Sequence, residues 1–402
     1  MKVLINAVSA KLGGAATYIR NLARSLPELA ASEDSFVLVV PPEQGTGMES
    51  SAQVRVESGP AASGAYGRRW WWDQVTLRRI LARERPDVLF SSANFAMHLC
   101  PCPQALLVRN PLYFSPVYDR GVLPGKGLAL RAETAARRWL AWRSMRAADC
   151  VVTPSQALLD DIRRTTPLKG TRAVVNPYGV PRARLHTPPA PRAPGAKLRL
   201  LWVSHYADHK DLATLLRAAA RLRGEELPFE LTLTLDPGQR GQHTVMPPAE
   251  RALLGQLGDA ARLAGVLDYE ATWRLYAEAD IFVFPSLLES FGHPLVEALA
   301  SGVPVVASDI AIHREVCDSA AEYFAPGDDA ALATLLRRLL ADSHARARLA
   351  ARARPRAQLF VWEDHVARLL ATLRETAVSR RRVVDQPAAP VAQNVQRSTF
   401  HP

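Results

Sequence analysis

Residues 281–309, IFVFPSLLESFGHPLVEALASGVPVVASD, decide the fold of this chain. The apolar run at 281–284 predicts a strand buried on both faces, and 303–307 predicts a second one. Between them we expect a helix over 294–301, because proline suits the first turn of a helix. Gly302 then suits the left-handed turn that ends many helices. The stretch therefore predicts a strand–loop–helix–strand unit.

Two glutamates lie in this unit, Glu289 on the loop and Glu297 in the first turn of the helix. The N-terminus of that helix, at Phe291 and Gly292, follows the end of a strand, and such a place binds anions. The two carboxylates would accept hydrogen bonds from hydroxyl groups of a ribose or a sugar. Phosphate on backbone amides and hydroxyls on carboxylates together describe a nucleotide-sugar site. The alternative is that Glu297 is only a favourable first-turn acid and Glu289 a solvated loop residue.

This stretch resembles the signature of the retaining glycosyltransferases of family 4, which have the GT-B fold. The signature has two glutamates separated by seven residues, a helix of small residues and the motif G-x-P-V. These features are found at Glu289, Glu297, Gly302, Pro304 and Val305, and flanking matches occur at Gly265, Val266, Leu275, Tyr276, Ala279, Asp280, Glu315, Tyr323, Pro326 and Gly327. The resemblance implies an α/β chain whose two Rossmann-like domains face each other across a cleft. It also implies transfer of a sugar from a nucleotide-diphosphate sugar to an acceptor hydroxyl, with retention of anomeric configuration.

A length of 402 residues is expected to form two domains. We predict an N-terminal Rossmann-like acceptor domain over 1–180 and a C-terminal Rossmann-like nucleotide-sugar domain over 198–360. Residues 181–197 contain five prolines and are predicted to be the linker. A helix over 361–376 is expected to cross back to the N-terminal domain, as in the GT-B fold. Residues 377–402 lack periodicity and are predicted to be disordered.

The resemblance also assigns roles to residues of the C-terminal half. The family has an arginine and a lysine that reach the donor diphosphate from the loop after the first strand of this half. Lys210 matches the lysine, and His205 stands at the arginine position. Glu297 is implied to bind the ribose, Glu289 to lie beside the donor sugar near the reacting centre, and the backbone near Val266 to meet the base. Without the resemblance, Lys210 would be read as a solvated lysine.

The N-terminal half carries weaker signals for the acceptor side. A strand, the pair Gly13-Gly14 and a helix over 15–26 make a Rossmann-like opening, although G-x-G-x-x-G is absent. The resemblance implies that this glycine loop faces the donor phosphates and the acceptor, whereas the alternative is a tight turn. Arg109 and Asn110 follow a predicted strand at an edge where open α/β sheets bind ligands. Many family members have a histidine at that place.

We expect neither a metal nor a cofactor, since the nucleotide sugar is itself a substrate. No D-x-D motif stands where a metal-dependent transferase would need one, and the four cysteines have no metal-binding spacing. We predict that the cysteines are reduced. The charge of the leaving diphosphate would then be met by Lys210, His205 and the helix dipole at Phe291 and Gly292.

The basic charge of the chain is concentrated in one stretch. The formal net charge is +11, and residues 120–146 hold seven basic residues and one acid. A helix over 127–147 alternates apolar and basic positions and contains Trp139 and Trp142, a pattern typical of a helix lying on an anionic membrane surface. The alternative is a surface helix packed on its domain. With no signal peptide and no apolar run of ~18 residues, we expect a cytoplasmic protein, peripheral at the inner membrane face.

The predicted acceptor is a lipid-linked sugar or a polysaccharide or glycolipid of the cell envelope. One alternative is a GT-B enzyme that does not transfer the sugar, such as a nucleotide-sugar epimerase, which would need acid and base groups for proton abstraction. A second alternative, a nucleic-acid-binding protein, rests on charge alone. The basic stretch has no recognised nucleic-acid-binding motif, so we expect no nucleic acid as a partner.

Overall fold

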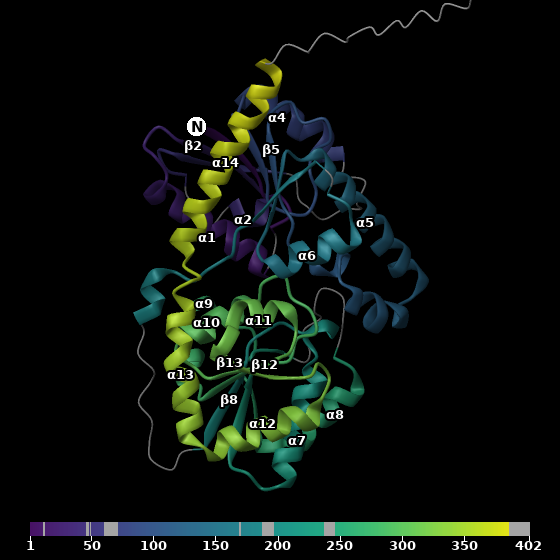
Figure 1. Cartoon of the computed structure of the whole chain (residues 1–402), viewed down its shortest axis with the longest axis vertical. Coiled ribbons are helices and arrows are strands. Elements are labelled where there is room, and N and C mark those ends of the chain that lie inside the picture. Colours follow the sequence, from purple (N-terminus) through teal and green to yellow (C-terminus); the bar gives the residue numbers. More distant parts are fainter. Residues whose placement is uncertain are drawn as a thin grey trace, which may run out of the picture.

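The computed structural model describes residues 1–10, 13–45, 48, 50–59, 71–168, 170–186, 197–236 and 246–385. These residues form two parallel β-sheets, each packed against helices, and the two sheets lie one above the other in Figure 1. Among the described residues, no helix is both long enough and apolar enough to cross a bilayer.

The N-terminal sheet has seven strands in the order β3-β2-β1-β4-β5-β6-β7. The strands are β1 (Lys2–Asn6), β2 (Ser35–Val40), β3 (Val54–Ser58), β4 (Val88–Ser91), β5 (Gln104–Leu107), β6 (Cys150–Thr153) and β7 (Arg172–Val175). The helices are α1 (Gly13–Leu29), α2 (Pro42–Gly45), α4 (Leu77–Glu84), α5 (Leu128–Ala147) and α6 (Gln156–Thr165). The strand order reverses between β1 and β4, and ligands bind beside such reversals in open α/β sheets.

The C-terminal sheet has six strands in the order β10-β9-β8-β11-β12-β13. The strands are β8 (Leu198–Trp202), β9 (Phe229–Leu233), β10 (Ala261–Leu263), β11 (Ile281–Phe284), β12 (Val305–Ser308) and β13 (Ala321–Phe324). The helices are α7 (Leu212–Gly224), α8 (Pro248–Leu257), α9 (Tyr269–Glu278), α10 (His293–Ala300), α11 (Ala311–Cys317), α12 (Asp329–Ala341) and α13 (Ser343–Ala357). Here the order reverses between β8 and β11, so the loops after these two strands meet.

Residues 281–309 fold nearly as their sequence pattern predicts. β11 covers the predicted residues, with all four side chains buried. Helix α10 begins at His293, one residue before the predicted start, and Gly302 has a φ of 76°. β12 begins at Val305, two residues later than predicted, and pairs in parallel with β11. Because both neighbours of β11 are parallel strands, its continuous apolar run is buried on both faces.

Alternate residues of the strands build separate cores on the two faces of a sheet. Val3 of β1 belongs to a core that also holds Tyr18 of α1, whereas Leu4 belongs to a second core with Leu77 and Leu81 of α4. Each face therefore buries apolar side chains under a helix, and burial stabilises the fold by about 25 cal/mol per Å² of apolar surface.

The last helix, α14 (Trp362–Asp385), packs against α1 of the N-terminal part. The Trp362 indole donates a hydrogen bond of 2.8 Å to Ser25 Oγ on α1. The predicted end at residue 376 is wrong, and so is the predicted disorder of 377–385, because the apolar stripe of the helix continues through buried Ala377. Residues 386–402, also predicted to be disordered, lie outside the described residues.

The chain passes between the two sheets twice, at neighbouring places. Val180 and Val361 form a parallel β-bridge, in which Val180 N–H donates to Phe360 O at 3.0 Å and Trp362 N–H donates to Val180 O at 2.9 Å. A Cβ on Gly179 would lie 2.4 Å from the Val361 carbonyl carbon, so only glycine fits there. The two crossings therefore form one short, tightly packed ribbon.

Two further expectations change in the structure. Helix α1 does not stop before Pro27 but continues to Leu29. A proline removes only one backbone hydrogen bond, and Ala30 N–H still donates to Leu26 O at 2.9 Å. In the predicted linker, residues 182–186 form a 3₁₀ turn, and 187–196 lie outside the described residues.

Candidate active site

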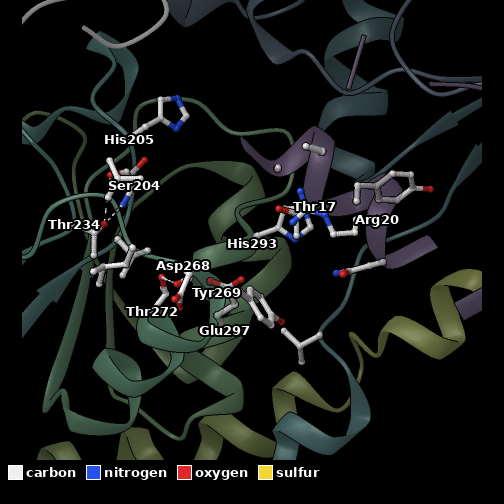
Figure 2. Close-up of a pocket in the computed structure, with 18 of the residues that line it drawn as sticks. Thr17, Arg20, Ser204, His205, Thr234, Asp268, Tyr269, Thr272, His293 and Glu297 are labelled. Carbon is white, nitrogen blue, oxygen red and sulfur yellow. Dashed lines mark hydrogen bonds between the residues drawn. The ribbon is translucent and has the colours of Figure 1, made fainter. Parts of the chain in front are cut away.

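A cleft of about 640 Å³ lies between the two sheets. One wall comes from α1, which presents Thr17 and Arg20 to the cleft, and the opposite wall comes from the loops after β8, β9 and β10 and from α10 (Figure 2). The second wall presents the polar side chains of Ser204, Thr234 and Glu297. The cleft thus combines basic and hydroxyl groups on one side with hydroxyl and carboxyl groups on the other.

Two helix N-termini point at this cleft. Gly14, in the first turn of α1, lines it, and a Cβ there would meet no atom within 4 Å. On the opposite side α10 begins at His293 after Gly292, whose φ is 84°, and no side chain caps that end. The first amides of a helix lack internal partners and carry partial positive charge. The two ends together offer a place for a negatively charged group.

Glu297 stands on the floor of the cleft, one turn into α10. Its Oε2 accepts a hydrogen bond of 2.9 Å from the Tyr276 hydroxyl of α9. Burial raises the pKa of Glu297 to about 7, although the hydrogen bond from Tyr276 lowers it. This carboxyl group therefore changes charge near neutral pH. Tyr269 and Asp268, at the start of α9, line the cleft beside it (Figure 2).

Val266 and His205, two of the residues predicted to bind the donor, also line the cleft. The Val266 side chain is 68% exposed. Loss of hydration, followed by the charge of Lys210, lowers the pKa of His205, so its ring is neutral at neutral pH. His205 therefore lacks the charge that an arginine would provide at that position.

Glu289 and Lys210 form a buried ion pair beside the cleft and are absent from its lining. Lys210 Nζ donates to Glu289 Oε1 at 2.5 Å, and Lys210 is only 7% exposed. Burial alone would raise the pKa of Glu289, but the charge of Lys210 holds it below the usual value. Glu289 is therefore ionised at neutral pH. Lys210 lies in the loop after β8 and Glu289 in the loop before α10, and these two segments also carry the cleft-lining residues His205 and His293.

The loop that carries Glu289 is fixed at several points. Leu287 N–H donates to His209 O at 2.8 Å, and the Ser308 hydroxyl donates to Ser286 O. Phe291 is buried and packs edge-on against Tyr178, with ring centroids 5.4 Å apart. Its position in the packed interior explains why only its backbone can serve the helix N-terminus that the sequence predicted.

Three residues were predicted on the acceptor side of the cleft: Gly13, Arg109 and Asn110. Asn110 caps the 3₁₀ turn Pro111–Tyr113 by accepting from Leu112 N–H at 3.1 Å, and it does not line the cleft. Arg109 N–H donates to Asn94 Oδ1 at 2.9 Å, and Arg109 is also absent from the cleft lining. Gly13 is the first residue of α1.

Several cleft residues were missed by sequence reasoning. His293 is one, and its ring stacks on Tyr178 with centroids 4.8 Å apart and an angle of 11°. Burial lowers the pKa of His293 to about 4, so it is neutral at neutral pH. Thr17, Arg20 and Arg24 also line the cleft. Their spacing puts three polar residues on one face of α1, a signal that the sequence did contain.

Within the described part of the chain, no three His, Cys, Asp or Glu side chains lie close enough together to hold a metal ion. Cys150 and Cys317 are buried in this part of the chain, and the Sγ atoms of Cys100 and Cys102 lie 3.8 Å apart, which is too far for a disulfide bond.

Comparison with known families gives two adjoining matches. The family described as "Glycosyltransferase Family 4" matches residues 12–184, and "Glycosyl transferases group 1" matches residues 186–356. The chain belongs to the family 4 glycosyltransferases with the GT-B fold. The predicted family and fold class are therefore confirmed. This family 4 chain places its cleft between the parts matched by the two descriptions.

Three known proteins illustrate the likeness. The MMP alpha-(1->4)-mannosyltransferase of Mycolicibacterium hassiacum is 34% identical over 178 residues, which are 42% of this chain and 41% of that protein. The alignment thus spans less than half of this relative. Sucrose-phosphate synthase from Thermosynechococcus elongatus has a TM-score of 0.75 at 19% identity, covering 93% of this chain and 98% of that one. HepE of Anabaena in complex with UDP-glucose has a TM-score of 0.66 at 16% identity, covering 94% and 100%.

Proposed function

We propose that this family 4 protein is a retaining glycosyltransferase. It moves a sugar from a nucleotide-diphosphate sugar to a hydroxyl of a lipid-linked, polysaccharide or glycolipid acceptor of the cell envelope. One observation carries the proposal: two helix N-termini and the Glu297 carboxyl group converge on one cleft. The HepE structure, solved with UDP-glucose, supports a nucleotide sugar as the donor. The mannosyltransferase relative supports transfer as the reaction.

In this proposal the donor lies along the second wall of the cleft. The base meets the backbone at Val266, and the ribose hydroxyls donate to Glu297. The diphosphate lies between the N-termini of α1 and α10, whose amides and dipoles stabilise the leaving charge. Lys210 contributes positive charge from behind the wall, and no metal ion is required.

The ionised Glu289 supplies negative charge beside the donor sugar. A glycosyl transition state resembles an oxocarbenium ion, so a nearby carboxylate stabilises it more than the ground state. Lys210 keeps Glu289 ionised in a place where burial alone would favour the neutral form.

A donor screen tests the proposed function. Thermal unfolding is measured with nucleoside diphosphates and their sugars, since a ligand at ~100 times its Kd stabilises a protein by about 2.7 kcal/mol. The best donor is then incubated with glycan and lipid-linked acceptors in the presence of EDTA, and transfer is expected to proceed. Conversion of the donor without any acceptor would indicate an epimerase, and loss of activity that Mg²⁺ restores would refute metal independence.

Donor binding should depend on pH through Glu297. Its raised pKa of about 7 means that the carboxylate, which accepts the ribose hydroxyls, is lost as pH falls through 7. We expect donor affinity to fall about tenfold between pH 8 and pH 6. The sugar nucleotide is the right probe because its diphosphate is ionised throughout this range. Calorimetry measures the affinity at each pH.

Two variants sharpen this prediction. Glu297→Gln should bind more weakly but with little change between pH 6 and pH 8. Glu297→Ala should lose about 1.5–3 kcal/mol of binding free energy, the usual size of a charge-assisted hydrogen bond. Unchanged affinity in Glu297→Ala would remove this residue from the donor site.

We further propose that α5 rests on an anionic membrane surface. At 100° per residue, Leu128, Arg131, Trp139, Arg143 and Arg146 fall on one stripe about 120° wide. All five are exposed, Leu128 at 79% and Trp139 at 57%. Exposed apolar and basic side chains on one stripe suit the headgroup region of a bilayer.

The predicted basic helix needs one correction. Arg137 pairs with Glu133, and Arg138 pairs with Asp119, so neither belongs to the exposed stripe. Their charges are partly neutralised within the same domain, whereas Arg131, Arg143 and Arg146 face solvent. Each basic residue near an anionic leaflet contributes about 1 kcal/mol, so these three can hold the protein reversibly.

Sedimentation with liposomes of graded anionic lipid content tests the membrane proposal. The variant Arg131→Glu/Arg143→Glu/Arg146→Glu is expected to lose most of the pelleted fraction, and added salt should release the wild type. The control Arg163→Glu/Arg251→Glu/Arg348→Glu makes the same charge change at exposed positions elsewhere. Equal pelleting of both variants, or none by the wild type, would reject the proposal.

A further inference from the structure

A carboxylate of the C-terminal part caps a helix of the N-terminal part. Glu315 of α11 accepts hydrogen bonds from the first two amides of α6, from Gln156 N–H to Oε1 and from Ala157 N–H to Oε2, both at 2.7 Å. Figure 1 shows α6 at the lower edge of the upper sheet, directly above α11. The free amides of a helix start normally turn to solvent or to a local side chain, and here they bind a residue 158 positions or more away.

A second contact joins the same helix end to the loop that carries Glu289. Ser155, the N-cap of α6, accepts from Leu158 N–H at 3.2 Å. Its hydroxyl also donates to Ser290 O at 2.7 Å, on the residue that follows Glu289. Ser155 is fully buried, so this hydrogen bond is shielded from water. The third amide of α6, that of Leu158, thus has an acceptor as well. All three amides of the first turn therefore donate to Ser155 or Glu315, the two residues that join the helix to the C-terminal part.

The backbone that carries Glu315 is itself held in place. Arg356 of α13 donates through Nε to Val316 O at 2.8 Å and through its terminal nitrogen to Glu315 O at 2.5 Å. These bonds fix the last turn of α11 against the C-terminal sheet. The negative charge of Glu315 also faces the positive end of the α6 dipole. Separation of the two parts would expose both the carboxylate and the amides to water.

We propose that Ser155 and Glu315 are positioning residues that clasp the two domains and hold the loop of Glu289 in its reactive place. The clasp has three hydrogen bonds between the domains: two from the amides of α6 to Glu315 and one from Ser155 to Ser290. It acts on catalysis through the backbone beside Glu289, and Ser155, Glu315 and Ser290 are all absent from the cleft lining. The predicted effect of the clasp on the reaction rate rests on the proposed transfer function. The clasp itself is a structural contact and does not depend on that function.

Hydrogen exchange tests the clasp without any assay of activity. Amides 156 and 157 of Glu315→Ala should exchange at least tenfold faster than in the wild type, because their acceptor is gone. X-ray scattering should show a larger radius of gyration for this variant. The control Glu225→Ala removes an exposed carboxylate that pairs with Arg337 inside the C-terminal part, and it should change neither measurement. Unchanged exchange and scattering in Glu315→Ala would overturn the clasp.

Kinetics tests the positioning role. We expect Glu315→Ala and Ser155→Ala to lower kcat about tenfold, while the affinity for the donor stays within twofold because neither residue lines the cleft. Ser155→Thr keeps the hydroxyl and should restore the rate. Asp328→Ala removes a comparable helix cap, that of α12, and should leave kcat unchanged. Lost protection with unchanged kcat would overturn the positioning role, whereas no transfer by the wild type would count against the proposed function alone.

Discussion

Glu289→Gln is expected to lower kcat by about 10²–10³-fold and to leave donor affinity nearly unchanged. The substitution preserves the shape of the side chain but removes its negative charge. In the native protein, Lys210 keeps the Glu289 carboxyl group ionised. A carboxylate beside a developing oxocarbenium ion acts mainly in the transition state, so its loss appears in kcat rather than in ground-state binding. The expected size is that seen when one preorganised electrostatic contact is removed from an active site.

Single-turnover kinetics with a saturating donor measures this effect directly. Glu322→Gln serves as the matched control, because Glu322 of the edge strand β13 pairs with Arg338 and is absent from the cleft lining. A kcat of Glu289→Gln within a few-fold of the wild type would show that Glu289 is not at the reacting centre.

Lys210→Met is expected to lower the free energy of unfolding by about 3–5 kcal/mol and to abolish most activity. Breaking a buried ion pair leaves one charge without compensation, which is among the costliest single changes in a protein interior. Lys210 and Glu289 are both about nine-tenths buried, so water cannot replace the lost partner. Glu289 would respond by taking up a proton, since burial without Lys210 raises its pKa.

The double variant Lys210→Met/Glu289→Gln separates the two effects. It removes both charges together, so stability should recover by at least half of the loss, whereas activity should not return. Urea unfolding followed by circular dichroism measures the free energies. If Lys210→Met unfolded at the wild-type denaturant concentration, the pair would contribute nothing to the folded state.

The sequence predicted the parts of the site that lie close together along the chain. The unit at 281–309 carries its own strand, turn and helix signals, and β11 and α10 fall where these signals place them. The pairing of Lys210 with Glu289 spans 79 positions and depends on the meeting of two loops at the strand reversal. No local pattern contains that information. The sequence suggested that each residue would face the donor separately, whereas the structure joins them behind the cleft wall.

Other failures have equally physical causes. The end of α14 was placed too early because residues after 376 lack an apolar periodicity in the sequence, although the buried stripe continues to Ala377. Asn110 was expected at the ligand edge, but its side chain is used by the turn that follows. His293 lies one helical turn before Glu297 on α10 and lines the same cleft, but the predicted helix began one residue after it.

The ribbon formed by Val180 and Val361 makes the C-terminal half an insertion within the chain of the N-terminal half. The two ends of this inserted part, the donor-binding cassette, lie side by side at Val180 and Val361. After the second crossing, α14 completes the N-terminal half by packing on α1. A chimera that exchanges the donor-binding cassette between relatives should therefore be spliced at these two neighbouring points. A chimera with a single junction near residue 190 would instead combine the N-terminal sheet of one protein with the last helix of another. It would place a foreign α14 against α1 and disturb the hydrogen bond between Trp362 and Ser25.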